Sequence, residues 1–160
     1  MNRPGLKFLF ASPAHFIACG LGSGLSPFAP GTAGTLAAWL LFPLLRARFS
    51  DAGLLIFLAA AFVIGIFVAQ RTGEALGVAD HGAIVWDEMV PFWLVLLMTP
   101  EGILWQAGAF FLFRAFDVVK PPPARWIDTR VKNGFGVMAD DVVAALYTLL
   151  VLAAVQRLTG

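Results

Sequence analysis

Long apolar stretches separated by short polar segments dominate the sequence from residue 35 onward. The stretches cover Thr35–Leu45, Ala52–Gln70, Ile84–Thr99, Ile103–Val119 and Val142–Gln156. A helix rises ~1.5 Å per residue, so the second stretch comes close to the ~30 Å thickness of a bilayer's hydrocarbon core. The pattern predicts an all-α fold, a polytopic membrane helix bundle of about five spans.

Proline and glycine mark the breaks between these stretches. Pro100-Glu101-Gly102 predicts a tight turn between two antiparallel helices, and Lys120-Pro121-Pro122-Pro123 predicts a helix end, because proline cannot continue a helix. The uncharged, glycine-rich segment Gly20–Thr35 predicts an N-terminal loop or a re-entrant segment that dips into the membrane. The basic residues and broken apolar run before it indicate a retained N-terminal segment, not a cleaved signal peptide.

The composition supports a lipid environment. The 160 residues suffice for one domain, 1–160, and 59% of them are hydrophobic while 13% are charged. Soluble domains carry about 25% charged residues, so this chain cannot cover itself with polar surface. The net charge of +1 gives no reason to expect a nucleic-acid partner, and the single cysteine, Cys19, is best explained as a buried inert thiol.

The distribution of lysine and arginine predicts an orientation, because these residues are enriched in cytoplasmic loops. One side of the predicted bundle holds Arg46, Arg48 and Arg157. The other holds the larger set: Arg3, Lys7, Arg71, Lys120, Arg125, Arg130 and Lys132. We therefore expect a cytoplasmic N-terminus, an external C-terminus, and acidic residues that converge on the cytoplasmic face.

Two acidic pairs, Asp87-Glu88 and Asp140-Asp141, each lead into an apolar stretch. Carboxylates inside a span cost about 2.5–3.5 kcal/mol each on insertion scales, so they require a reason. Compensation of a helix dipole explains one such residue, but two pairs favour a functional site.

A third acidic residue, Asp117, is spaced with Arg114 and Lys120 at i, i+3 and i+6, on roughly one helix face. This spacing suits either an internal ion-pair ladder or a ligand carboxylate flanked by cations that bind phosphate.

The donor types favour Mg²⁺, which prefers carboxylate oxygens and water, over zinc, which prefers cysteine and histidine. His81 is either an exposed loop histidine or a proton shuttle. Arg125 and its basic neighbours suit anionic lipid headgroups or a substrate phosphate. Ser26, Thr32 and Thr35 offer hydroxyls to an anion, although the glycines around them equally suit close helix packing.

Several phosphatase classes are excluded by missing motifs. Cys19 has no arginine six residues later, no Asp-x-Asp pair is present, and the Ser-Gly-His and Arg-x₅-His motifs of histidine-based lipid phosphatases are absent. A lipid phosphatase built from this sequence must therefore rely on carboxylates and metal.

Four ordered motifs resemble the phosphatidylglycerophosphatase A family, over nearly the whole chain. They are Gly22–Thr35, Asp80-His81-Gly82 with Ile84–Glu88, Phe113–Asp117 with Lys120-Pro121, and Gly134–Asp141. Ala145 and Pro91 stand where the family pattern has glycine.

The resemblance implies a bacterial inner-membrane enzyme of phospholipid biosynthesis. Its expected reaction is Mg²⁺-dependent removal of the terminal phosphate of phosphatidylglycerophosphate, giving phosphatidylglycerol. The expected metal ligands are Asp87, Glu88, Asp117, Asp140 and Asp141. These five residues and His81 are the expected catalytic residues, and the expected substrate-binding residues are Lys120, Arg125, Arg114, Thr32, Thr35 and Ser26.

Other functions use similar residues. A small cation transporter also coordinates ions with carboxylates, but it predicts midspan acids and internal repeats. A CDP-alcohol phosphotransferase predicts an Asp-Gly ahead of Ala124-Arg125, which is absent. A phosphatase acting on another lipid phosphate remains an alternative.

Overall fold

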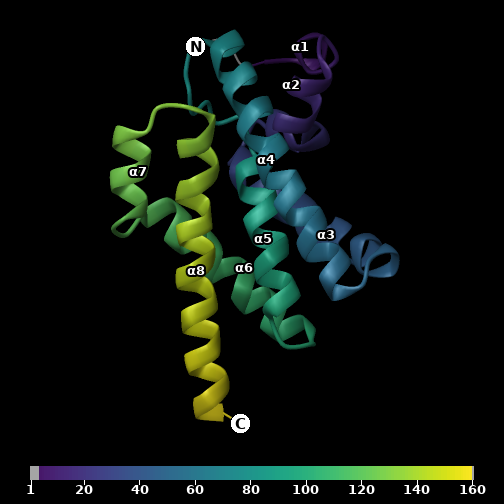
Figure 1. Ribbon diagram of the computed structural model, residues 1–160, viewed down its shortest axis with the longest axis vertical. Helices are drawn as coiled ribbons and strands as arrows, with labels where there is room; N and C mark the ends of the chain where they lie inside the picture. Colours follow the sequence, from purple (N-terminus) through teal and green to yellow (C-terminus); the bar gives the residue numbers. More distant parts are fainter. Residues whose placement is uncertain (1–3, 160) are drawn as a thin grey trace.

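The computed structural model describes residues 4–159, so Arg3 of the predicted cytoplasmic set lies outside the described residues. The described chain is all-helical, without strands, as predicted (Figure 1). Its elements are α1 (Leu6–Leu9), α2 (Pro13–Ala18), the 3₁₀ turn η1 (Gly20–Leu25), α3 (Pro30–Arg48), α4 (Asp51–Leu76), α5 (Trp86–Met98), α6 (Ile103–Val119), α7 (Ala124–Arg130) and α8 (Gly134–Thr159).

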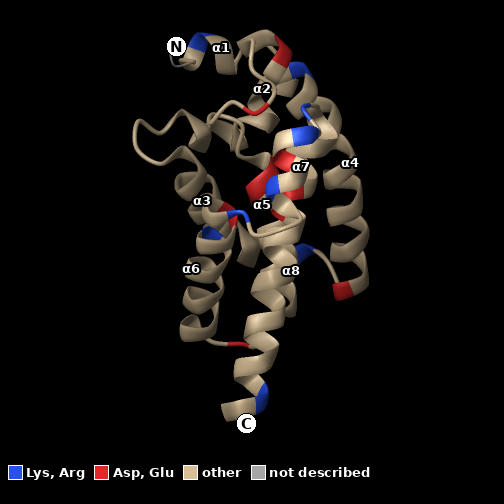
Figure 2. Ribbon diagram, turned by 90° about the vertical axis from the view of Figure 1, so that its left-hand side faces the viewer, with Lys and Arg blue, Asp and Glu red and all other residues tan. Residues whose placement is uncertain are grey.

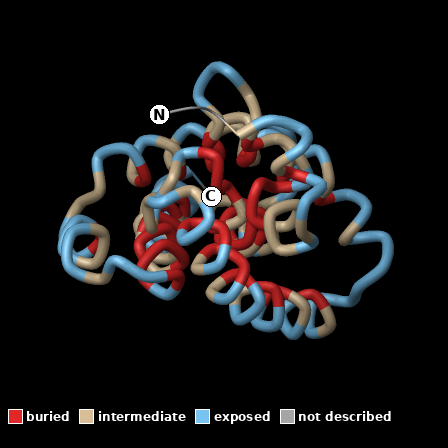
Figure 3. The backbone as a smooth tube through the Cα atoms, turned by 90° about the horizontal axis from the view of Figure 1, so that it is seen from above, coloured by how far each residue is buried: buried red, intermediate tan, exposed pale blue. Residues whose placement is uncertain are grey.

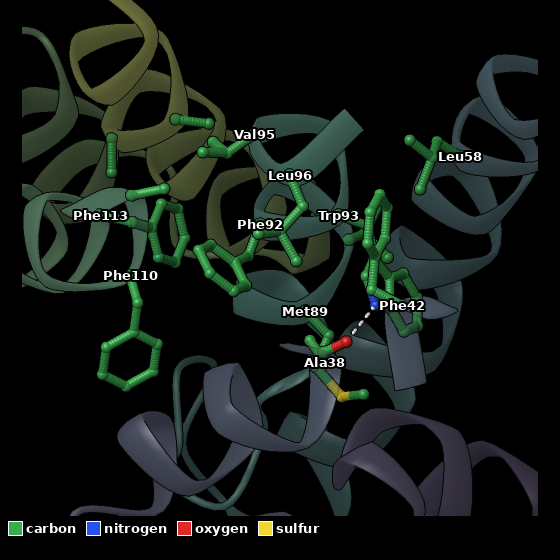
Figure 4. Close-up of a cluster of buried hydrophobic side chains, with 14 of the residues drawn as sticks. Ala38, Phe42, Leu58, Met89, Phe92, Trp93, Val95, Leu96, Phe110 and Phe113 are labelled. Atoms are coloured by element: carbon green, nitrogen blue, oxygen red, sulfur yellow. Dashed lines mark hydrogen bonds between the residues drawn. The ribbon is translucent and has the colours of Figure 1, made fainter. Parts of the chain in front are cut away.

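Helix α5 is the centre of the bundle and packs against α3, α4 and α8. Its large side chains fill the core, where the Phe92 and Phe113 rings lie 5.4 Å apart, centroid to centroid (Figure 4). The indole N–H of Trp93 donates a 2.8 Å hydrogen bond to the carbonyl oxygen of Ala38, which fixes α5 against α3. Burial of aromatic side chains of this size is a large source of stability.

Two of the described helices, α4 and α8, are long and apolar enough to cross a membrane. Each has 26 residues, and their best windows have mean hydropathies of 2.8 and 1.9. The 13 residues of α5 reach only ~20 Å at 1.5 Å per residue. The count of five spans therefore stays a prediction.

The outer surface of the bundle is apolar over much of its length. Figure 3 shows buried residues gathered inside and exposed residues outside. Large exposed apolar side chains occur on four long helices: Leu40, Ile56, Phe67, Leu104, Phe111, Leu150 and Leu158. Apolar surface of this extent is typical of a protein that contacts lipid or another protein.

The glycine-rich N-terminal segment is folded more fully than a loop. It forms η1 and the first turn of α3, which begins at Pro30, five residues before the predicted start. A Cβ atom on Gly24 would lie 2.1 Å from the carbonyl oxygen of Ala83. Glycine therefore lets η1 approach the segment that leads into α5.

The C-terminal helix also begins earlier than the sequence pattern predicts. The apolar stretch starts at Val142, but α8 begins at Gly134. Asp140 and Asp141 consequently lie near the second turn of the helix and not at its entry. The predicted turn at residues 100–102 and the bounds of α6 agree with the structure, because local proline and glycine residues mark both.

Candidate active site

Acidic residues from three helices gather near one end of the bundle. Figure 2 shows them beside α5, α7 and the beginning of α8, close to several cations. Asp87 and Glu88 lie in the first turn of α5, Asp117 in the last turn of α6, and Asp140 in α8. Three separate sequence motifs therefore supply one region of the molecule.

The first group is centred on Arg114. Its guanidinium nitrogen Nη1 lies 2.9 Å from Glu88 Oε2 and 2.5 Å from Asp117 Oδ2. The Thr35 hydroxyl lies 3.3 Å from the same Glu88 oxygen and also donates a 3.0 Å hydrogen bond to the carbonyl oxygen of Gly31. The contact between Arg114 and Asp117 is the ion pair that their i, i+3 spacing predicted as one of two alternatives.

Gly31 makes room for this group. A Cβ atom at Gly31 would lie 2.1 Å from Glu88 Oε1 and 2.8 Å from Arg114 Nη2. Because neither distance is compatible with a real side chain, the glycine allows Glu88 and Arg114 to meet against the first turn of α3.

The second group is centred on Lys120. Its ammonium forms ion pairs with Asp140 and, at 3.2 Å, with Asp128 of α7. Burial lowers the pKa of Lys120, but the hydrogen bond to Asp140 and the nearby acidic residues outweigh this and raise it above its ordinary value. Lys120 is therefore a fixed positive charge at neutral pH.

Three carboxylates surround this lysine. One oxygen from each of Asp80, Asp128 and Asp140 lies within 4.8 Å of the other two. Within residues 4–159, these three carboxylates are the group whose oxygens lie close enough together to hold a metal ion. Desolvation raises the pKa of the Asp80 carboxyl, and the neighbouring Lys120 ammonium opposes that rise.

Asp87 and Asp141 form no ion pair among the described residues. Both are buried, and both interact electrostatically with Asp117 and Asp140. Within the described chain, Asp87 Oδ1 is a buried oxygen without a hydrogen-bond partner. Pro91 also has no N–H to donate to the Asp87 carbonyl four residues earlier, so α5 leaves polar oxygen atoms free at this point.

The donor set fits Mg²⁺. Every candidate ligand is a carboxylate oxygen, as this hard cation prefers, and the partnerless Asp87 Oδ1 requires a cation or donor. Glu88 and Asp117 already share Arg114, and Asp140 pairs with Lys120, which leaves Asp87 and Asp141 as the predicted ligands without an ion pair in the described chain.

The remaining predicted residues occupy different surroundings. His81 and Ser26 line a separate cavity of about 350 Å³ that contains none of the clustered carboxylates. His81 Nδ1 accepts a 3.1 Å hydrogen bond from the Ala83 N–H, so this nitrogen already has a partner. Thr32 is half-buried in the first turn of α3, and Arg125 is exposed on α7.

Asp80 and Asp128 are the site residues that sequence reasoning missed. Asp80 precedes His81 in a polar turn, and Asp128 lies among the basic residues of α7. The sequence feature that could have identified them is their position close to His81 and Arg125, which were already assigned to the site. Their proximity to Asp140 depends on how α7 packs against α8.

Comparisons with known proteins agree over most of the chain. The model of the family described as phosphatidylglycerophosphatase A matches residues 16–156. A phosphatidylglycerophosphatase A from Haemophilus influenzae is 45% identical over 157 residues, covering 97% of this chain and 96% of the relative. One from Escherichia coli is 40% identical over 150 residues, covering 91% and 85%.

A third relative carries a different name. A Bacteroides thetaiotaomicron protein, provisionally named a phosphatidylinositol-3-phosphatase, is 39% identical over 154 residues and covers 90% of this chain and 94% of its own length. No solved structure gives a significant match.

Proposed function

The chain belongs to the phosphatidylglycerophosphatase A family and is a phosphatase, and from this premise we propose its reaction. The proposed reaction is Mg²⁺-dependent hydrolysis of the terminal phosphate of phosphatidylglycerophosphate, giving phosphatidylglycerol for phospholipid biosynthesis. The observation that carries the proposal is the convergence of carboxylates from α5, α6 and α8 around Arg114 and Lys120, beside an apolar helix surface.

Asp140 is the proposed centre of the metal site, because one of its oxygens lies within 4.8 Å of oxygens of Asp80 and Asp128. Asp87 and Asp141 are buried and interact electrostatically with Asp140, and we propose that they supply further ligands. Mg²⁺ bound by these oxygens would polarise a phosphate oxygen and lower the pKa of an attacking water. Glu88 and Asp117 complete the predicted set through their shared contact with Arg114.

The cations have the complementary role. Phosphoryl transfer places negative charge on the phosphate oxygens, and fixed positive groups stabilise it. Lys120 lies just beyond α6, where its ammonium already contacts Asp128 and Asp140. We propose that it turns from these carboxylates toward the substrate phosphate, while exposed Arg125 attracts the anionic headgroup.

The proton of the attacking water needs an acceptor. Asp87 is the residue best suited to this role, because its Oδ1 is buried and has no hydrogen-bond partner in the described chain. His81 was the other sequence-based candidate, but it lies beside Ser26 in the separate cavity and its Nδ1 is engaged by Ala83. A carboxylate is therefore the proposed base.

The membrane is the proposed location. The apolar outer surfaces of α3, α4, α6 and α8 suit lipid contact, and α4 and α8 are long enough to cross. A multi-pass protein of the bacterial inner membrane, with the acidic site at its cytoplasmic face, agrees with the distribution of lysine and arginine.

The names of the relatives differ in the lipid headgroup. Two are named for phosphatidylglycerophosphate and the third for phosphatidylinositol 3-phosphate. Both substrates are phosphomonoesters on a lipid, so the same carboxylates and cations suit either. A phosphatidylinositol-3-phosphatase is accordingly the second candidate function.

The test is phosphate release by the purified protein in mixed micelles. Phosphatidylglycerophosphate, phosphatidylinositol 3-phosphate and phosphatidic acid are compared at equal surface concentration. We expect the highest kcat/KM on phosphatidylglycerophosphate, no release in EDTA, and recovery with Mg²⁺. Preference for phosphatidylinositol 3-phosphate would establish the second function, and full activity in EDTA would refute the metal-dependent mechanism.

A further inference from the structure

An apolar groove lies between α4, α5 and α8, and its lining residues on α5 and α8 follow the acidic residues of those two helices along the chain. Its volume is about 340 Å³. Its lining includes Leu55, Ala59 and Phe62 of α4, Val90 and Leu94 of α5, and Val142 of α8. We call this feature the α4–α5–α8 groove.

The groove is continuous with the site along one face of α5. Asp87, Val90, Pro91 and Leu94 recur at i, i+3, i+4 and i+7, which places them on one stripe of the helix. The stripe starts at the carboxylate whose Oδ1 lacks a partner and continues as purely apolar lining. On α8, Val142 follows Asp141 and therefore lies at nearly the same height along the helix, although on a neighbouring face.

A second hollow extends the groove away from the site. It has a volume of about 400 Å³, shares Leu94 with the first, and continues along α8 to Gln156. Fourteen residues separate Val142 from Gln156, which is ~21 Å at 1.5 Å per residue. One leaflet is about half of the ~30 Å hydrocarbon core, so the two hollows together are long enough to span one leaflet.

We propose that the α4–α5–α8 groove binds one acyl chain of the lipid substrate. The inference rests on the proposed function, because only a lipid joins a phosphate to a long hydrocarbon chain. The surface changes from charged at the site to apolar in the groove, as a lipid phosphate changes from headgroup to acyl chain. Carboxylates and cations lie at the headgroup end, and uncharged apolar side chains line the rest down to Ala153, apart from Gln156 at the far end of the second hollow.

This arrangement gives the groove a purpose in the reaction. A chain held along α5 and α8 directs the glycerol backbone toward Asp87 and Asp141, so binding far from the phosphate orients the reacting group. It also selects lipid phosphates over soluble phosphomonoesters, which would bury no hydrocarbon in the groove.

Adjacent alanines on α4 provide a matched test. Ala59 lines the groove, while Ala60 is exposed on α4 and is not part of the lining. Ala59→Trp fills the groove, and Ala60→Trp adds the same side chain outside it. Each variant is assayed on dioleoyl phosphatidylglycerophosphate in mixed micelles and on its soluble dibutyryl analogue, with Mg²⁺.

We expect Ala59→Trp to lower the ratio of long-chain to short-chain kcat/KM at least about ten-fold, the effect of removing roughly two methylene groups from contact. Ala60→Trp should leave this ratio at the unsubstituted value. An unchanged ratio in Ala59→Trp, or an equal fall in both variants, would overturn the proposal and mean that the groove holds only bulk lipid.

Two further outcomes are distinguished in the same experiment. A change in oligomeric state with an unchanged ratio would assign the groove to a second copy of the chain, against the proposal. Should Ala59→Trp lose helical circular dichroism, Ala59→Leu is judged by the same ratio. Absence of phosphate release from both substrates by the unsubstituted protein would instead refute the proposed function.

Discussion

At the scale of single residues, the site is divided between two cations. Arg114 pairs with Glu88 and Asp117, while Lys120 pairs with Asp128 and Asp140. The buried acids Asp87 and Asp141 lie close enough to both groups to interact with them electrostatically. Buried carboxylates of like charge repel one another, and nearby cations, a metal or protonation relieve that repulsion. The division thus explains how so many carboxylates occupy one apolar bundle.

Neutralising the acids should remove activity without unfolding the chain. We expect Asp87→Asn, Glu88→Gln, Asp117→Asn and Asp141→Asn each to lower kcat at least about 100-fold, the scale of losing a catalytic acid or base. The measurement is phosphate release, with circular dichroism as the folding check.

The matched control for this series is Asp51→Asn, because Asp51 is exposed at the beginning of α4 and forms an ion pair with Arg46, away from the site. It should retain the kcat of the unsubstituted protein. Near-normal kcat in three of the four site variants would contradict the assignment of the acids.

Gly31 offers a test that separates geometry from stability. Its added Cβ would meet the ends of two flexible side chains, Glu88 and Arg114, which can move aside. We therefore expect Gly31→Ala to keep nearly the thermal stability of the unsubstituted protein while losing most phosphate release, because the displaced carboxylate and guanidinium no longer meet.

Alanine substitutions at two other glycines serve as controls for Gly31→Ala. A Cβ on Gly136 would lie 1.8 Å from the Val131 carbonyl oxygen, a backbone atom that cannot move aside, so Gly136→Ala should lower the unfolding temperature. Gly108 lies inside α6 with open space around it, so Gly108→Ala should leave activity unchanged and raise stability slightly, because alanine favours the helix more than glycine. If Gly31→Ala behaves like Gly108→Ala, the proposed role of the Glu88–Arg114 contact is wrong.

At the scale of elements, Lys120 joins the end of α6 to α7 and α8. Its backbone adopts a left-handed conformation at φ 49°, which ends the helix and turns the side chain toward Asp128 and Asp140. The short helix α7 in turn packs along α8. Lys120 therefore links the end of α6 to α7 and α8 through ion pairs next to the proposed metal site.

Removing this cation should affect both stability and activity. Lys120→Met leaves Asp128 and Asp140 without their shared partner, and breaking a buried pair costs about 3–5 kcal/mol at the upper limit. We expect a lower unfolding temperature and a large fall in kcat, measured by thermal unfolding in detergent and by phosphate release.

A double substitution separates these two effects. Adding Asp128→Asn to Lys120→Met removes one of the two acids that lose Lys120. Lys132 still lies 3.9 Å from Asp128, so this change should restore only a small part of the stability and none of the activity. Recovery of activity along with stability would show that Lys120 acts only as a structural tie.

At the scale of the whole molecule, α1 and the end of α8 lie at opposite ends of the long axis (Figure 1). The acidic site lies toward the end that holds α7, and the turn between α5 and α6 lies toward the other. This arrangement agrees with the predicted orientation, in which α7 faces the cytoplasm and residues 100–102 face outward.

Labelling of single cysteines tests that orientation. In a Cys19→Ser background, Arg125→Cys should react with a membrane-impermeant maleimide only after spheroplasts are opened, while Glu101→Cys should react in intact spheroplasts. Both positions are exposed, so access depends on the membrane alone. Reaction of both from the same side would contradict the topology and the cytoplasmic placement of the site.

The sequence by itself determined the helical class, the family, the turn at residues 100–102 and the ends of α6. Local causes suffice for these features, because proline and glycine end helices wherever they occur and apolar runs require burial or lipid. The tertiary structure alone decided which charges meet. Thr35, Glu88 and Arg114 come from three helices, and Asp80 joins Asp128 and Asp140 only when α7 and α8 pack. Distances between such remote residues follow from helix packing, which no local pattern encodes.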